Sequence, residues 1–208
     1  GDGTTANVKE NISKLGTNML TLRVGQERRG PPREDNSAKA FEDDDIVAIK
    51  NEIQNVKAVA SENSSSINIV YGNKSNASFV IGTNNDYFII KDWELSDGRI
   101  FDESELSTGK SSCILGSTIV KQLFEDENPI GANIRLKSFS CNVIGVLKSK
   151  GASAFGRDQD EVVIVPLKMS QRKIKGDKDI SSILISITEG KYIENAKSDI
   201  TALMQERR

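Results

Sequence analysis

The stretch DDDIVAIKNEIQNVKAVAS, residues 43–61, joins a helical pattern directly to a strand pattern. Three carboxylates stand before Ile46, Ile49 and Ile53, which recur at helical spacing, so a helix is predicted over 43–54. A strand is expected to follow at 56–60. Three consecutive aspartates could form part of a metal site, but at this position they favour capping of the helix start.

Outward from this stretch, short strands alternate with short helices. Leu20, Leu22 and Val24 alternate with polar residues and predict a strand at 19–24, which makes a βαβ unit with the helix and the strands after it. Ser117 is the predicted N-cap of one of the later helices. The further expected strands are 66–71, 77–82, 112–115, 133–137, 139–147, 161–165 and 182–187, and the further expected helices are 87–93, 117–124 and 191–205.

This order predicts an α+β fold with one subdomain inserted into another. Residues 17–82 and 161–208 are expected to form a discontinuous α+β subdomain, and residues 83–160 a second α+β subdomain within it. Val8, Ile12 and Leu15 predict a helix over 4–15, which Gly16 ends. Between strands 161–165 and 182–187, a basic connector is expected at 170–178.

Composition removes many function classes. The 208 residues carry 28 Lys and Arg against 30 Asp and Glu, which argues against a nucleic-acid-binding protein. There is no histidine, so the commonest general base, the serine and cysteine triads and the usual zinc ligands are missing. No apolar run approaches the ~20 residues of a membrane helix. Because the sequence starts at Gly1, we expect it to be part of a longer chain.

Two short motifs resemble catalytic signatures only in part. TGKSS at 108–112 has the end of a phosphate-binding loop, but Ser104 stands where its first glycine is needed. Ser170 and Lys173 have the spacing of a serine nucleophile and its lysine base, within a charged segment and without the accompanying K-T-G. We therefore expect no catalytic, cofactor or metal residues in this sequence.

The two cysteines, Cys113 and Cys141, both lie in apolar strand patterns. As free thiols they would be small buried residues. In an oxidising compartment they could instead form a disulfide between two strands. Both alternatives stay open on the sequence.

Two polar loops are the candidates for partner contact. One is 25–40, and the other is KSKGASAFGRDQDE at 148–161. In the second, Phe155 stands among small residues, where an apolar ring either folds back or is offered to a partner.

Several segments together are similar to a known family. They are ENISKLGTNMLTLRVG (10–25), the DDDIVAIK helix, NDYF (85–88), GRIF (98–101), ILGSTIVKQLF (114–124), NPIGANI (128–134), VIGV (143–146), the loop containing FG, and VVIVP (162–166). Each motif is short, but in this order and spacing the chain resembles the extracytoplasmic domain of MacB-type ABC transporters over nearly its whole length.

This resemblance implies a domain at the periplasmic face of the bacterial inner membrane, between two transmembrane helices of a permease. Residues 1–16 would be a stalk helix that continues the first of them, and the discontinuous subdomain would be porter-like. Implied partners are a periplasmic adaptor protein, an outer-membrane exit duct reached indirectly, a second copy of the chain and an amphipathic export substrate such as a macrolide, peptide or toxin. ATP and Mg²⁺ would bind a separate cytoplasmic domain, so this sequence alone should not hydrolyse ATP.

Under that resemblance, Gly151, Phe155, Gly156 and Arg157 are the hypothesised partner contacts. Three alternatives remain. A lipoprotein-releasing permease would pass lipoproteins to a carrier chaperone. A free solute-binding protein would need a deep cleft between lobes. A cell-wall hydrolase fits poorly with a chain that has no histidine.

Overall fold

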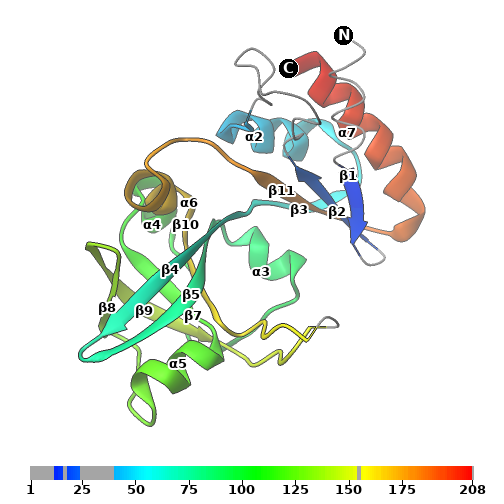
Figure 1. The fold of residues 1–208 in the computed structure, drawn as a ribbon. Coiled ribbons are helices and arrows are strands. Elements are labelled where there is room, and N and C mark those ends of the chain that lie inside the picture. The colour runs from blue at the N-terminus through cyan, green and yellow to red at the C-terminus, as the bar shows by residue number, and fades with distance from the viewer. Residues whose placement is uncertain (1–11, 16–17, 24–39, 154–155, 208) are drawn as a thin grey trace, which may run out of the picture. The chain divides into compact units, whose positions relative to one another are not determined.

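Contacts divide the chain into two units, Gly1–Glu62 with Asp179–Arg208, and Asn63–Lys178. The structure, a computed structural model, describes residues 12–15, 18–23, 40–153 and 156–207 (Figure 1). Among these residues, no helix has both the length and the apolar character needed to cross a bilayer.

In its described residues, the first unit is a four-stranded antiparallel sheet with two α-helices and a 3₁₀ turn at Gly190–Tyr192. Its strand order is β1-β2-β11-β3, so β11 lies between β2 and β3 and runs antiparallel to both. Strands β2 and β3 are therefore parallel to each other, and helix α2 connects them in a split βαβ unit. Helix α2 contacts β3, α7 contacts β2, and the two helices contact each other. The bounds are β1 Ile12–Leu15, β2 Met19–Arg23, α2 Asp43–Glu52, β3 Val56–Ser61, β11 Ser182–Ile187 and α7 Ile193–Arg207.

The predicted apolar stripe of the last helix is confirmed. Ile193, Ala196, Ile200 and Leu203 of α7 are all buried. Buried residues of the sheet, Leu20 and Leu22 among them, complete the core of this unit. Since isolated helices of this length are marginal in water, burial of this face holds the helix in place.

The second unit is a closed barrel. Strands β9, β7, β10, β5, β4 and β8 pair in that order, and β8 pairs back to β9, while β6 is added to β9 alone. Pairs β5–β10 and β7–β9 are parallel, and the other pairs are antiparallel. The bounds of its strands are β4 Asn63–Tyr71, β5 Lys74–Thr83, β6 Leu95–Gly98, β7 Ser112–Leu115, β8 Asn133–Leu136, β9 Phe139–Leu147 and β10 Val162–Pro166.

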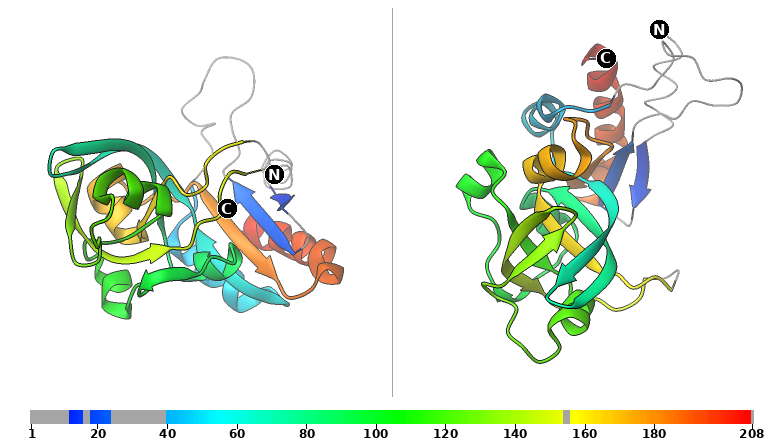
Figure 2. Two further views of the ribbon diagram at one scale, coloured as in Figure 1. Left: turned by 90° about the horizontal axis from the view of Figure 1, so that it is seen from below. Right: turned by 60° about the vertical axis from the view of Figure 1, so that its left-hand side comes forward.

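Helices complete the core of the barrel (Figures 1 and 2). Helix α5 contributes Ile119, Leu123 and Phe124 to the same apolar cluster as the inward residues of the strands, and Met169 and Ile174 also belong to it. The barrel is thus filled by side chains. Its helices are α3 Asp86–Ile90, α4 Glu103–Thr108, α5 Ser117–Phe124, α6 Leu167–Met169 and the π-helix Ser170–Lys175.

Several expectations differ from the structure, and Gly116 rather than the predicted Ser117 is the N-cap of α5. Residues 12–15 of the predicted N-terminal helix form strand β1, which pairs with β2, and residues 1–11 and 16 lie outside the described residues. The basic connector at 170–178 contains the π-helix. Two of its cations have partners in the same unit: Arg172 donates to the Thr108 carbonyl oxygen at the end of α4, and Lys173 donates to the Ser111 hydroxyl.

The unit boundaries also differ from the expected ones at 82 and 161. Strands β4 and β5 form a hairpin, and β5 pairs in parallel with β10, so all three belong to the barrel. The α+β class agrees with the prediction, and the contacts give one unit of Gly1–Glu62 with Asp179–Arg208 and a second unit over 63–178.

Candidate functional site

The sequence motifs that resemble catalytic signatures are not assembled into sites. In TGKSS, Gly109 is the left-handed C-cap of α4, and strand β7 follows it. A phosphate-binding loop needs a strand before it and a helix after it. Lys173 donates to the Ser111 hydroxyl, while the buried Ser170 hydroxyl has no hydrogen-bond partner. The described ranges contain no group of three or more His, Cys, Asp or Glu residues that could hold a metal ion.

Of the aspartates at 43–45, Asp45 takes part in capping helix α2, as the sequence indicates, and Glu42 is the N-cap residue. The Glu42 backbone N–H donates to the Asp45 carboxylate at 2.9 Å, within a capping box. The other oxygen of Asp45 accepts from Arg207 Nε at 2.8 Å. Both carboxylate oxygens of the buried Asp45 therefore have partners within the protein, and a metal ion is not needed to explain its burial.

Both cysteines are free thiols buried in the barrel core. Cys113 on β7 pairs in register with Val143 on β9, two residues after Cys141, so the two thiols lie on neighbouring strands. Burial, together with the neighbouring Cys141 thiol, raises the pKa of Cys113 well above its ordinary value. Little thiolate is therefore available for reaction in the folded barrel.

The partner-contact loop predicted at 148–161 forms two paired limbs, 149–153 and 156–160, which we call the 149–160 hairpin (Figures 1 and 2). Ala152 and Asp158 form an isolated antiparallel bridge. The Ser153 N–H donates to the Arg157 carbonyl at 2.7 Å, and the Gln159 N–H to the Gly151 carbonyl at 3.1 Å. The described part of the loop is therefore an ordered hairpin.

Asp160 closes the base of this hairpin. The residue is 3% exposed, and its carboxylate accepts hydrogen bonds from the Ser149 hydroxyl at 2.7 Å and from the N–H groups of Lys150 and Gly151 at 2.8 and 2.9 Å. Burial pushes the pKa of Asp160 upward, but these hydrogen bonds outweigh burial and hold the pKa below the ordinary 3.8. Asp160 is thus a fixed negative charge that joins the two limbs.

Three of the four hypothesised partner contacts, Gly151, Gly156 and Arg157, lie in this hairpin. Gly151 and Gly156 are exposed with φ of +76° and +81°, which favours glycine, and their surroundings are open to solvent. Arg157 is exposed, and its guanidinium lies 3.9 Å from the centroid of the Phe79 ring on β5. A stacked guanidinium keeps its in-plane N–H groups directed outward toward acceptors. Phe155, and the loop predicted at 25–40 apart from residue 40, lie outside the described residues.

Sequence reasoning did not single out Asp160 or Asp158. The hydroxyl of Thr118 on α5 donates to Asp158 at 2.6 Å, so this second aspartate fixes the outer part of the hairpin to the barrel. The available signal was the pair of aspartates in RDQDE, because Asp side chains in loops bind nearby backbone N–H groups.

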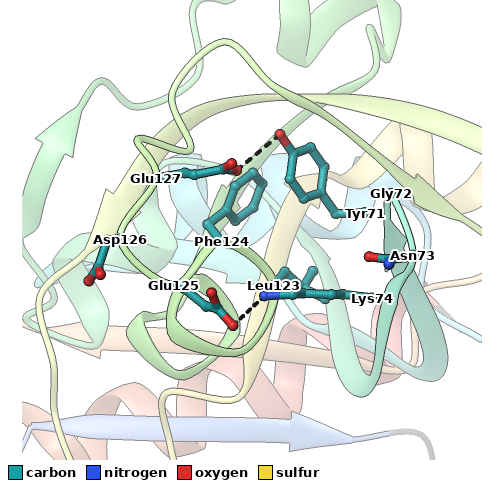
Figure 3. Close-up of a pocket in the computed structure, with 9 residues that line it drawn as sticks. All are labelled: Tyr71, Gly72, Asn73, Lys74, Leu123, Phe124, Glu125, Asp126 and Glu127. Atoms are coloured by element: carbon teal, nitrogen blue, oxygen red, sulfur yellow. Dashed lines mark hydrogen bonds and ion pairs between the residues drawn. The ribbon is translucent and has the colours of Figure 1, made fainter.

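A pocket of about 360 Å³ lies between the β4–β5 turn and the end of α5 (Figure 3). The Tyr71 and Phe124 rings contact each other at a tilt of 32°, with centroids 4.1 Å apart, and Lys74 forms an ion pair with Glu125. These contacts tie the turn to the helix end, and the sequence did not indicate the pocket. Its lining residues are Tyr71, Gly72, Asn73, Lys74, Leu123, Phe124, Glu125, Asp126 and Glu127.

Comparison with known proteins identifies the family. Residues 1–203 match the MacB-like periplasmic core domain. The chain is 31% identical over 208 residues to a macrolide export ATP-binding/permease protein MacB of Chlorobium phaeobacteroides, and 29% identical over 208 residues to the MacB protein of an Azoarcus species. All of this chain is covered in both cases, but only 32% and 31% of those relatives, so the chain spans about a third of their length.

Solved structures share the fold. The periplasmic region of MacB from Actinobacillus actinomycetemcomitans superimposes with a TM-score of 0.73 at 23% identity, over 97% of this chain and 88% of that one. The extracellular domain of the noncanonic ABC-type transporter YknZ from Gram-positive bacteria gives a TM-score of 0.69 at 22% identity, over 86% of this chain and 88% of that one. From the match over residues 1–203, the chain belongs to the family of MacB-like periplasmic core domains.

Proposed function

We propose that this chain is the extracytoplasmic, adaptor-binding part of an ABC-type exporter. It would bind a periplasmic adaptor protein and transmit motion driven by ATP hydrolysis elsewhere in the transporter. Family membership carries this proposal, because the matching relatives are named as export permeases with ATP binding. In such a transporter the chain would act beside a second copy and connect through the adaptor to an outer-membrane exit duct.

The location and the cargo form part of the same proposal. The chain would lie at the periplasmic face of the inner membrane and contact amphipathic substrates such as macrolides, peptides or toxins. ATP and Mg²⁺ would bind a separate cytoplasmic domain. A hairpin held in one conformation supports the adaptor-binding role, since a pre-ordered loop loses little entropy on binding.

The exposed face of the hairpin is proposed as the adaptor contact, with Gly151, Phe155, Gly156 and Arg157 at its centre. Arg157 is suited to an acidic residue of the adaptor, because stacking on Phe79 leaves its N–H groups free to donate in the plane. Phe155 would supply the apolar part of the same contact.

Binding of the purified 208-residue chain to the periplasmic adaptor of the same organism tests the proposal. Surface plasmon resonance should show saturable binding, which Phe155→Asp weakens at least tenfold. Val47→Asp is the matched control, because Val47 is a 53% exposed apolar residue on α2 of the other unit. Equal binding by Phe155→Asp and the unmodified chain would reject the hairpin as the contact. No binding by the unmodified chain would reject the adaptor role.

The alternative function is that of a lipoprotein-releasing permease domain. Its partner would be a lipid-carrying periplasmic chaperone in place of the adaptor. The same binding assay with that chaperone separates the two functions, since each predicts one partner and excludes the other. The names of the full-length relatives favour the exporter.

A further inference from the structure

Hydrogen bonds to one buried carboxylate join the two limbs of the 149–160 hairpin at its base. Both carboxylate oxygens of Asp160, on the second limb, accept hydrogen bonds from the first limb: Oδ1 from the Lys150 N–H, and Oδ2 from the Ser149 hydroxyl and the Gly151 N–H. Bonds to an ionised acceptor are stronger than bonds between neutral groups. One buried side chain therefore links two chain segments nine to eleven residues apart.

The barrel fixes Asp160 itself. A Cβ atom on Gly116 would lie 2.1 Å from the Asp160 carbonyl oxygen, so the start of α5 packs directly against the backbone of this residue. The Gly116 N–H also donates to the Val162 carbonyl at 2.8 Å. The anchor of the hairpin is consequently part of the rigid barrel.

The first limb has a further anchor on the neighbouring surface. The Lys150 ammonium donates to the Lys91 carbonyl and lies 5.2 Å from the centroid of the Trp93 ring. Trp93 in turn donates from its ring nitrogen to the Lys148 carbonyl at 2.8 Å. The base of the hairpin is thus fixed on two sides, and its orientation depends on the backbone path at Lys150 and Gly151.

We propose that Asp160 is the positioning residue of the hairpin: it fixes the two limbs in the conformation that the adaptor recognises. This inference rests on the proposed function, which names the adaptor as the binding partner. Asp160 is buried and touches no partner itself, so it acts only through the order of the hairpin. Without it, the adaptor would have to order the limbs on binding, which weakens affinity.

The test compares Asp160→Asn with the unmodified chain. Asparagine keeps the size of the side chain but replaces one accepting oxygen with an NH₂ group, which cannot accept. Hydrogen exchange of the Lys150 and Gly151 amides, measured by NMR, should become at least tenfold faster. Adaptor affinity should fall about tenfold, as expected when a few side chains must be ordered on binding.

Asp126→Asn is the matched control, because Asp126 is an exposed aspartate near the end of α5 and the charge change is the same. It should leave both readouts unchanged. If Asp160→Asn unfolds the chain, Ser149→Ala removes one donor and should change both readouts in the same direction by a smaller factor.

The possible results separate this inference from the proposed function. Unchanged amide exchange in Asp160→Asn would overturn the positioning role. Faster exchange with unchanged affinity would show that the adaptor does not read the hairpin, which also overturns the inference but leaves adaptor binding intact. Failure of the unmodified chain to bind the adaptor would overturn the proposed function and, with it, the partner named here.

Discussion

The carboxylate of Glu105 faces the guanidinium of Arg99 through two hydrogen bonds, of 2.8 and 3.1 Å. The Ser112 hydroxyl and the Asp102 N–H also donate to it, and Glu105 is 4% exposed. Hydrogen bonding from Arg99 is the main cause that lowers the pKa of Glu105 from 4.5 to about 2, against the opposing effect of burial. Arg99 belongs to the GRIF motif, so this motif has a structural role in the barrel.

The free energy of unfolding of the barrel should therefore fall at acidic pH. Because the folded-state pKa of Glu105 lies below the unfolded one, its contribution is complete above pH 4.5 and is lost as the pH falls toward 2. The loss should reach up to roughly 3 kcal/mol. Urea denaturation followed by the fluorescence of Trp93, the single tryptophan, measures it. Glu105→Gln should be less stable at pH 7 and lose less between pH 4.5 and 2; parallel pH curves would contradict this assignment.

The two cysteines allow a second test at the residue scale. Burial and the raised pKa of Cys113 predict that neither thiol reacts with Ellman's reagent in the folded chain, and that two react per chain after denaturation in guanidinium. Absence of reactive thiols after denaturation would show that a disulfide joins Cys113 and Cys141. The denatured chain serves as the reference for full reactivity.

Single residues were predictable from sequence only where the signal is local. The three aspartates before Ile46 indicated helix capping because a cap and its helix are adjacent in the chain. For Asp160 the only signal was its place in the polar RDQDE segment, which does not indicate its partners. Two of its partners are backbone N–H groups nine and ten residues earlier, and any residue type other than proline can supply them.

At the scale of single elements, helix α2 offers a test of its own cap. Asp45→Ala removes both the hydrogen bond to the Glu42 N–H and the ion pair with Arg207 of α7. We expect a loss of roughly 1–3 kcal/mol in the free energy of unfolding. Asp43→Ala is the control, since Asp43 is exposed in the same first turn and should cost less than about 1 kcal/mol. Equal losses in urea denaturation would show that Asp45 acts only through its charge.

Most helices and strands were predicted from hydrophobic periodicity, and the elements that were missed depend on tertiary contacts. Strand β7, helix α5 and strand β11 have the bounds that alternation and helical spacing predicted. The helical turns at 167–175 were missed because their charges resemble a solvated connector. In the folded barrel, Lys168 and Arg172 instead bind carbonyl oxygens at the end of α4. Such partners are set by tertiary structure, which a local pattern does not contain.

Strand β1 was also mispredicted because of tertiary structure, here with a strand in place of an expected helix. Apolar residues at 8, 12 and 15 suit a helix, yet residues 12–15 pair with residues 19–22 of β2 as an antiparallel hairpin. Hydrogen bonding to an existing sheet can override a weak helical preference.

For the whole molecule, an insertion was predictable but its limits were not. The order of strands and helices indicated that the last strand and helix return to the first unit, and β11 does pair between β2 and β3. Strand β5, however, pairs in parallel with β10, which lies about eighty residues later. Alternation predicts that both are strands without specifying the pairing, so β4, β5 and β10 were placed in the wrong unit.

Because the barrel is closed, its strands should fold only together, and this can be tested with two fragments of the inserted unit. The fragment 63–178 contains every barrel strand and should fold by itself, with cooperative urea unfolding reported by Trp93 and a dispersed NMR spectrum. The fragment 83–160 lacks β4, β10 and nearly all of β5, so three neighbouring strands and half of the ring are missing. It should remain unfolded, because open sheet edges and an uncovered apolar core offset the burial that is left. A folded 83–160 fragment, or an unfolded 63–178 fragment, would contradict the barrel as the independent unit of this chain.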